Sequence, residues 1–148
     1  MSDPSRFGLA QFPPYRLNAA AARVSRGFAR RYRDEFGLSI PEWRVLAHLH
    51  AADGRAVSVR DIEAHAEIEK STVSRAAARL AQAGLVDRAA QDADRRLVAL
   101  TLTDRGRELM ARLIPLALRF QSELLAELGP AAAGLADALD ALESRAAG

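Results

Sequence analysis

The stretch EIEKSTVSRAAARLAQAGLVDR, residues 67–88, decides how the chain folds. It contains the only lysine of the protein, Lys70, and three hydroxyl side chains and an arginine follow within five positions. Apolar residues then recur at the spacing of one helix face, which predicts a helix from near Glu69 to Gln82, ended by Gly84. Because the first turn of a helix carries the positive end of its dipole, this basic and hydroxyl-rich turn is suited to an anionic partner.

The segments around this helix predict a helix-turn-helix with a hairpin behind it. Ser58 begins a preceding helix, and Asp61, three positions later, gives a capping box with the shorter acid. Beyond the second helix, residues 85–86 open a short strand, residues 89–94 (AAQDAD) form a polar turn, and apolar alternation from Arg96 marks a second strand. The predicted fold class is therefore mainly α with a small β-hairpin wing, a winged helix-turn-helix.

Further helices are predicted on both sides of this lobe. Pro13 and Pro14 exclude a helix before them, which leaves residues 1–12 as a loose arm. A helical pattern follows from Tyr15 to Phe36. Ser39 caps the next helix, whose apolar side is predicted to be Trp43, Leu46, Ala47 and His50.

The last third of the chain is predicted to be helical. Thr103 caps a long helix that runs to about Leu128, and a final helix covers residues 131–145. The leucine-rich stripes of these helices need a partner surface, and a second copy of the chain is the simplest one. The expected organisation is one compact protomer in three parts. These are an arm and dimerisation helix (residues 1–36), a DNA-binding lobe (37–103) and C-terminal dimerisation helices (104–148).

The composition excludes several classes of protein. Without cysteine the chain has no disulfide framework, zinc–thiolate site or thiol switch. No apolar run approaches the roughly 20 residues that span a bilayer, and the first residues lack an apolar signal core, so we expect a cytoplasmic protein without membrane contact. Nucleotide-binding loops, serine elbows and zinc-protease pairs are missing, so we expect no enzyme, no catalytic residues and no cofactor. His48 and His50 diverge on a helix and His65 lies on another, so no metal site is expected.

The first turn of the helix over residues 69–82 is the main candidate for DNA contact, because an α-helix fits the major groove. Ser71, Thr72 and Ser74 can donate to phosphate oxygens or base edges, Arg75 can reach a guanine with two hydrogen bonds, and Lys70 suits a phosphate. The alternative is that the hydroxyls only cap the helix and the cations lie on a solvated face. Capping accounts for one hydroxyl, so three hydroxyls beside two cations favour DNA.

The wing tip, DADRR at residues 92–96, is the second candidate. Arg95 and Arg96 can enter the minor groove, where the potential is most negative. Asp94 is expected to pair with an arginine and fix the shape of the wing. The alternative is a solvated turn with local ion pairs. The complete set of predicted DNA contacts is Ser58, Lys70, Ser71, Thr72, Ser74, Arg75, Arg79, Asp94, Arg95 and Arg96.

Residues 85–106, LVDRAAQDADRRLVALTLTDRG, resemble the wing of the MarR family, the multiple-antibiotic-resistance-type regulators. The residues that fit the family pattern are Asp94, Arg96, Leu100, Thr101 and Gly106. Residues 69–88 resemble the recognition helix and the strand after it, and the order of helices is similar from Tyr15 to the end. The resemblance implies a homodimer joined through the N-terminal helix and the last two helices, which regulates transcription by binding double-stranded DNA at a near-palindromic operator.

The same resemblance implies an effector, since many members respond to small phenolic or carboxylate ligands in a cleft beside the DNA-binding lobe. Tyr15, Arg16 and Trp43 are the candidates, because an aromatic ring beside an arginine suits an aromatic acid. The alternative is that Trp43 is a core residue and Arg16 is solvated.

Two functions from different classes remain on this basis. The first is a dimeric DNA-binding regulator, a repressor released by a small aromatic or carboxylate ligand. The second is a winged-helix scaffold that binds another protein and has little affinity for DNA.

Overall fold

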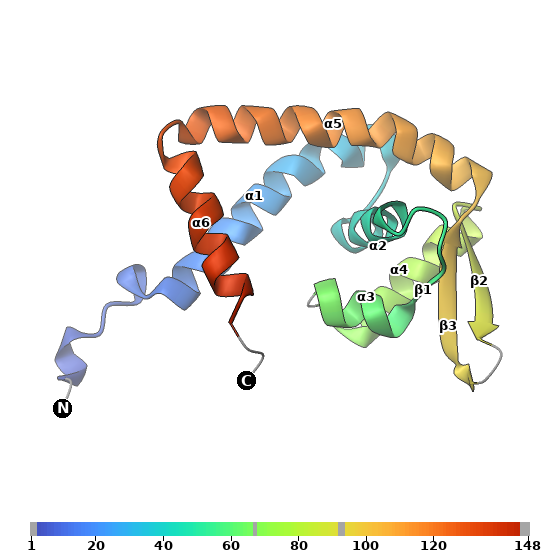
Figure 1. The fold of residues 1–148 in the computed structure, drawn as a ribbon, viewed down its shortest axis with the longest axis horizontal. Helices are drawn as coiled ribbons and strands as arrows, with labels where there is room; N and C mark the ends of the chain where they lie inside the picture. Colours follow the sequence, from blue (N-terminus) through green and yellow to red (C-terminus); the bar gives the residue numbers. More distant parts are fainter. Residues whose placement is uncertain (1–2, 67, 92–93, 146–148) are drawn as a thin grey trace. The chain divides into compact units, whose positions relative to one another are not determined.

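The computed structural model describes residues 3–66, 68–91 and 94–145, and for residues 91 and 94–97 it describes the backbone alone. Two compact units divide at Leu113 and Ile114. The elements in chain order are α1 (Pro13–Phe36), α2 (Ile40–Ala51), β1 (Val57–Ser58), α3 (Val59–Ala66), α4 (Lys70–Gln82), β2 (Val86–Gln91), β3 (Asp94–Leu102), α5 (Asp104–Leu128) and α6 (Ala131–Glu143) (Figure 1). The predicted fold class, helical with a β wing, is confirmed. None of the helices in the described ranges is both long and apolar enough to cross a membrane.

The first two helices begin and end where the sequence provides caps. α1 starts at Pro13, earlier than the predicted Tyr15, because proline fits the first turn, where no N–H partner is needed. It ends at Gly37, whose φ of 65° is a left-handed conformation that glycine adopts without strain. Ser39 and Glu42 then form a reciprocal capping box with N···O distances of 3.2 and 3.3 Å. The start of α2 is therefore as predicted.

The segment before α1 is more regular than the predicted loose arm. It contains two short 3-10 turns, Pro4–Arg6 and Leu9–Gln11. The rings of Phe7 and Phe12 meet edge to face, with centroids 5.3 Å apart. Both rings remain exposed, so this local contact leaves apolar surface on the arm uncovered.

The buried side of α2 differs from the predicted one. Val45, Leu46 and Leu49 are buried, whereas His50 is exposed and Trp43 is half-buried. The buried set follows the i, i+3, i+4, i+7 spacing from Glu42, and His50 lies at the flank of this stripe, about 90° from its centre. The largest fully buried side chains of the first unit are Tyr32, Leu46, Ile62, Leu80, Leu100, Met110, Leu113, Val45 and Val73.

The wing belongs to a three-stranded antiparallel sheet, in the order β1-β3-β2 (Figure 1). The sequence predicts only the two strands of the hairpin, and the structure adds a third strand, β1. β1 pairs with β3, Val57 with Leu100 and Ser58 with Ala99. The predicted polar turn over residues 89–94 is also too long, because residues 89–91 belong to β2 and 94 to β3. Residues 92–93 of that turn lie outside the described ranges. Alanines and a glutamine can pair through their backbones without an apolar pattern, and so the strand extends past the point where the pattern ends.

A hydrogen-bonded junction joins the end of α4, the wing and the start of α5. The Thr103 hydroxyl donates to the carbonyl oxygen of Gly84 at 2.6 Å and accepts from the N–H of Gly106 at 3.0 Å, as predicted for a helix cap. The N–H of Thr103 donates to the Leu85 carbonyl oxygen at 3.1 Å. Gly106 is buried, and a Cβ atom there would overlap that same carbonyl oxygen. Gly106 therefore allows the two backbone segments to approach closely, which a residue with a side chain would prevent.

The second unit comprises the rest of α5 and α6, and much of its apolar surface is uncovered. Large exposed side chains are Leu118 and Leu125 on α5 and Leu135, Leu139 and Leu142 on α6. The three leucines of α6 are spaced i, i+4 and i+7, which places them on one helix face. The predicted end of this helix, near residue 145, lies two residues beyond the observed end at Glu143.

Candidate nucleic-acid interface

The two sides of α4 differ in the way that a groove-binding helix requires. Val73, Ala76, Ala77 and Leu80 are buried against the core of the first unit. At about 100° per residue, Arg75 lies nearly opposite Val73, and it is exposed. The other exposed side chains of the predicted set on this helix are Lys70, Ser71, Ser74 and Arg79, while Thr72 is half-buried. The structure thus brings the predicted polar residues of α4 together on its solvent side.

The hydroxyl groups of α4 do not cap the helix, which removes the simplest alternative explanation for them. The N-cap residue is Glu69, and its side chain makes no capping hydrogen bond. Its carbonyl oxygen accepts from the N–H groups of Thr72 and Val73 at 3.0 and 3.1 Å. The hydroxyl of Thr72 accepts a long, 3.5 Å hydrogen bond from Arg75, which directs that guanidinium along the first turn. In the described part of the chain the exposed hydroxyls of Ser71 and Ser74 make no such bond, so they are available to an external partner.

Ser58 differs from the other predicted contacts. It is only 9% exposed, and its hydroxyl accepts from the N–H of Asp61 at 3.0 Å. This bond confirms the predicted cap at the start of α3, and it accounts for the serine without a DNA contact. A direct contact from Ser58 stays an untested prediction.

The backbone of the wing brings its predicted residues to the tip. Gln91 pairs with Asp94, and the register shifts between Ala90 and Gln91. Such bulges increase strand twist and redirect side chains near sheet ends. Asp94, Arg95 and Arg96 open β3, but their side chains lie outside the described part of the structure, as do residues 92–93. Their roles therefore stay predictions.

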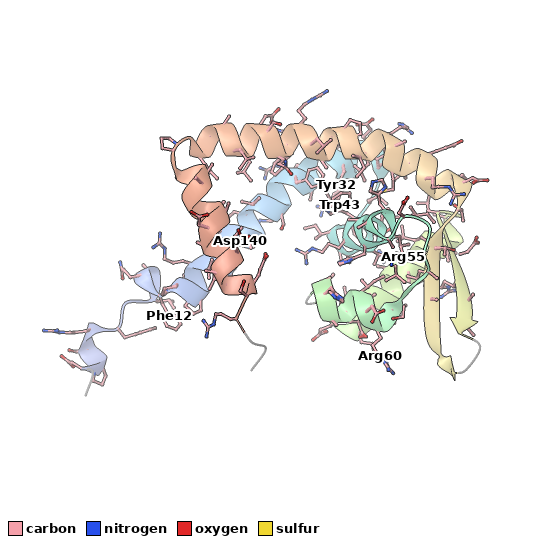
Figure 2. All side chains as sticks on the ribbon, in the orientation of Figure 1. Phe12, Tyr32, Trp43, Arg55, Arg60 and Asp140 are labelled. Carbon is pink, nitrogen blue, oxygen red and sulfur yellow. The ribbon has the colours of Figure 1, made fainter. Side chains whose placement is uncertain are left out.

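The effector candidates are not brought together in the described part of the chain. Trp43 contacts Phe28 and Tyr32 of α1, with ring centroids 5.1 and 5.9 Å apart. Figure 2 labels Trp43 and Tyr32. Tyr32 is buried, and burial raises the pKa of its hydroxyl. Tyr15 and Arg16 are exposed and line neither of the two described cavities.

Trp43 packs against α1 and also lines a cavity, and its predicted contact with an effector stays a prediction. Its contacts with α1 make it part of the aromatic core, and it also lines a cavity of about 370 Å³ on the surface of α2. The other residues that line this cavity are Arg44, Ala47, His48, Ala51 and Ala66. Arg44 and His48, the polar residues beside the tryptophan at this cavity, are not among the predicted effector contacts.

His48 at this cavity faces His65 of α3, with ring centroids 6.5 Å apart. Burial lowers the pKa of His48, and the nearby His65 lowers it further. The Nδ1 atom of His65 lies 2.8 Å from the carbonyl oxygen of Asp61, so it carries the proton in the neutral ring. In the described ranges no group of three metal-binding side chains forms.

Comparison with known proteins agrees with this architecture. The MarR family model matches residues 36–97. The HTH-type transcriptional repressor IacR of Pseudomonas putida is 29% identical over 113 residues, which cover 75% of this chain and 66% of the repressor's own length.

Solved structures extend the match to most of the chain. The MarR family transcriptional regulator SPO1453 from Silicibacter pomeroyi DSS-3 is 31% identical and has a TM-score of 0.73, and the match covers 92% of this chain and 98% of that one. The protein belongs to the MarR family. BpsR of Bordetella bronchiseptica, whose DNA binding is regulated by 6-hydroxynicotinic acid, is 25% identical with a TM-score of 0.78, and the match covers 94% and 98% of the two chains.

As a MarR-family protein, the chain is a DNA-binding transcriptional regulator and not an enzyme. The cavity residues that the sequence did not indicate are Arg44 and His48, which line it together with Trp43. A signal was present, because residues 44, 47, 48 and 51 follow i, i+3, i+4, i+7 spacing on α2. That stripe mixes charged and small residues, so a hydrophobic pattern does not detect it.

Proposed function

We propose that this MarR-family regulator is a homodimeric repressor that binds a near-palindromic operator through α4 and the wing, and that a small aromatic or carboxylate ligand releases it. The observation that carries the proposal is the exposed side of α4. Lys70 and Arg75 are exposed beside the hydroxyls of Ser71 and Ser74, outside the buried stripe of α4. Hydroxyl, ammonium and guanidinium donors on one helix face suit phosphates and base edges.

The proposed dimer rests on uncovered apolar surface in both units. Exposed large apolar side chains occur on the arm and α1, including Phe7 and Leu17, and on the leucine-bearing sides of α5 and α6. Monomeric proteins rarely leave so many such groups in water. A two-fold partner would cover them and would present two copies of α4 to successive major grooves. By this proposal residues 1–36 and 104–148 supply the dimer contacts, and residues 37–103 supply the DNA contacts.

The proposed effector response rests on two observations of different kinds. A relative of the same fold, BpsR, has its DNA binding regulated by 6-hydroxynicotinic acid. This chain has a cavity beside Trp43, Arg44 and His48, where an aromatic ring and a cation lie close together. Aromatic stacking and a positive charge favour an aromatic acid.

The repressor proposal is tested with Arg75→Ala in a fluorescence anisotropy titration against the DNA upstream of the protein's own gene. Loss of a two-hydrogen-bond contact to guanine is expected to cost about 1–3 kcal/mol, which is roughly 5- to 150-fold in affinity, and to relax the preference at one base pair in each half-site. Arg30→Ala is the matched control, because Arg30 is also exposed but lies on α1. It should change affinity little.

The same titration separates the two candidate functions. Arg96→Ala should weaken binding to cognate and scrambled DNA alike, since a minor-groove or phosphate contact carries little base information. Equal losses for Arg75→Ala on both DNAs would show that α4 is not the helix that reads the bases. If the unaltered protein binds neither DNA, the scaffold function is the better account.

A further inference from the structure

Two of the three histidines of the chain meet where α2 and α3 pack together. His48 on α2 is half-buried and His65 on α3 is exposed, and their ring centroids lie 6.5 Å apart at an interplanar angle of 54°. The third, His50, is exposed and lines the other described cavity, at the end of α2. The chain therefore has one histidine pair and one separate histidine.

The hydrogen bond of His65 determines which of its nitrogens takes up a proton in acid. Nδ1 lies 2.8 Å from the carbonyl oxygen of Asp61, which can only accept, so Nδ1 carries the proton of the neutral ring. The second proton is therefore added at Nε2, and the bond to Asp61 is kept in both states. Because this bond holds the ring on its own helix, the charge that His65 gains stays beside His48.

The described residues that line the cavity beside His48 include a cation and no carboxylate. Arg44 lies one helical turn before His48 on α2 and lines the same cavity. Burial lowers the pKa of His48 from the ordinary value of 6.5, and the charge of His65 lowers it further. Glu67, which follows the cavity residue Ala66, lies outside the described ranges.

The other elements that pack against α2 bring no charge to the pair in the described part of the chain. These elements are α1, α4 and β3. α1 presents aromatic rings, and of these Tyr32 stays neutral because burial raises the pKa of its hydroxyl. The buried side chains of α4 and β3 are apolar. A protonated His48 would therefore face two cations, His65 and Arg44.

α3 connects the histidine pair to the helix that carries the predicted DNA contacts. It packs against α4, β1 and β3 as well as against α2, and it directly precedes α4 in the chain. Ile62 of α3 is fully buried in the core, and the Ser58 hydroxyl caps the helix from β1. A displacement of α3 from α2 would therefore change how α4 is held and would disturb the sheet from which the wing extends.

We propose that His48 and His65 form a pH-sensitive switch of DNA binding. Near neutral pH the uncharged rings lie together, and α3 holds α4 in the position that contacts DNA. In acid both rings gain a proton, like charges meet, and α3 moves away from α2. The proposal rests on the proposed function in one respect, that α4 contacts the DNA.

The direction of the pH effect follows from the environment of His48. The folded protein favours the neutral ring, because burial and His65 both lower the pKa of His48. A lowered pKa of a base stabilises this arrangement fully above the ordinary value of 6.5, and the stabilisation is lost as the pH falls through the lowered pKa. DNA binding should therefore weaken in acid and not in alkali.

The test measures the affinity of the full chain for the DNA upstream of its own gene by fluorescence anisotropy, at constant salt and at about pH 7.5 and pH 5.5. The unaltered protein should bind roughly tenfold more weakly at the lower pH, the effect of about one pKa unit. This sign is informative, because added positive charge by itself strengthens binding to DNA. His48→Gln and His65→Asn should each bind with nearly equal affinity at both pH values, since one member of the pair then stays neutral.

His50→Gln is the matched control, because His50 lies on the same helix as His48 but outside the pair. It should keep the roughly tenfold loss in acid, as the pair is intact. Circular dichroism of each variant at both pH values checks that the helices are formed.

Titration of the imidazoles by NMR, without DNA, tests the contact itself. In His65→Asn the pKa of His48 should rise, because the neighbouring charge is removed while the burial remains. The asparagine amide can still donate to the carbonyl oxygen of Asp61, so α3 can keep that bond. In the unaltered protein, amide shifts of α3 and α4 should follow the titration of His48.

Three results would overturn the switch. They are equal or tighter DNA binding of the unaltered protein in acid, a loss in acid that persists in both His48→Gln and His65→Asn, and an unchanged pKa of His48 in His65→Asn. If the unaltered protein binds no DNA at either pH, the proposed function fails by itself. The NMR titration then decides the switch, since amides of α3 and α4 that do not follow His48 would contradict it.

Discussion

Leu139→Glu is expected to leave the protein as a monomer and to weaken its binding to a two-half-site operator by roughly 100-fold or more. Leu139 is 40% exposed at the centre of the α6 leucine stripe, so a carboxylate there would have to be buried without a partner in the proposed dimer. A monomer holds one half-site, and it loses the gain of roughly 10²–10⁴ that linking two sites provides. Sedimentation should give a mass near the 16.0 kDa of the single chain, whereas the unaltered protein should sediment near twice that value.

Ala141→Glu is the matched control for this change. It adds the same side chain to the same helix, two positions along and about 200° around the axis, where the leucines do not lie. It should remain dimeric and bind DNA normally. If Leu139→Glu also sediments as a dimer with full affinity, the leucine side of α6 is not the dimer contact.

Gly106→Ala is expected to destabilise the protein by about 3 kcal/mol or more. The added Cβ would overlap the carbonyl oxygen of Leu85 and approach the carbonyl carbon to 3.1 Å. Backbone atoms cannot rotate away as a side chain does, so the junction between the wing and α5 has to open. Urea unfolding followed by circular dichroism should show a much lower midpoint.

Gly134→Ala is the opposite case within the same chain. A Cβ at Gly134 meets no atom within 4 Å, and the residue lies inside α6. Alanine should therefore raise the stability by about 0.5–1 kcal/mol, since glycine costs helix stability. Similar unfolding midpoints for both variants would contradict the close approach at Gly106.

The helices and the wing could be predicted because their signals are local. Ser39, Ser58 and Thr103 cap helices through bonds to residues three positions away, and the sequence contains that spacing. β1 was missed because two residues are too few to show alternation, and its pairing partner lies far along the chain at Leu100. His50 was misplaced because a histidine on a short helix was counted as apolar.

The candidate site also has a part that local sequence signals predict and a part that they do not. The polar side of α4 follows from the periodicity of one segment, so the exposure of Lys70 and Arg75 could be predicted from the sequence. The cavities depend on tertiary packing, which also brings His48 to His65 across separate elements. No spacing in the sequence indicates such a pair, and for this reason the predicted effector set of Tyr15, Arg16 and Trp43 retained only the tryptophan at a described cavity.

The salt dependence of operator binding tests the central claim, DNA recognition by the cationic side of α4 and the wing, most directly. A dimer that presents Lys70, Arg75, Arg95 and Arg96 twice should neutralise about 6–8 phosphates, which gives a slope of roughly −5 to −7 for the logarithm of the association constant against the logarithm of salt concentration. Anisotropy titrations from low to physiological salt measure this slope. We predict a value in that range, and a slope near zero would contradict the account.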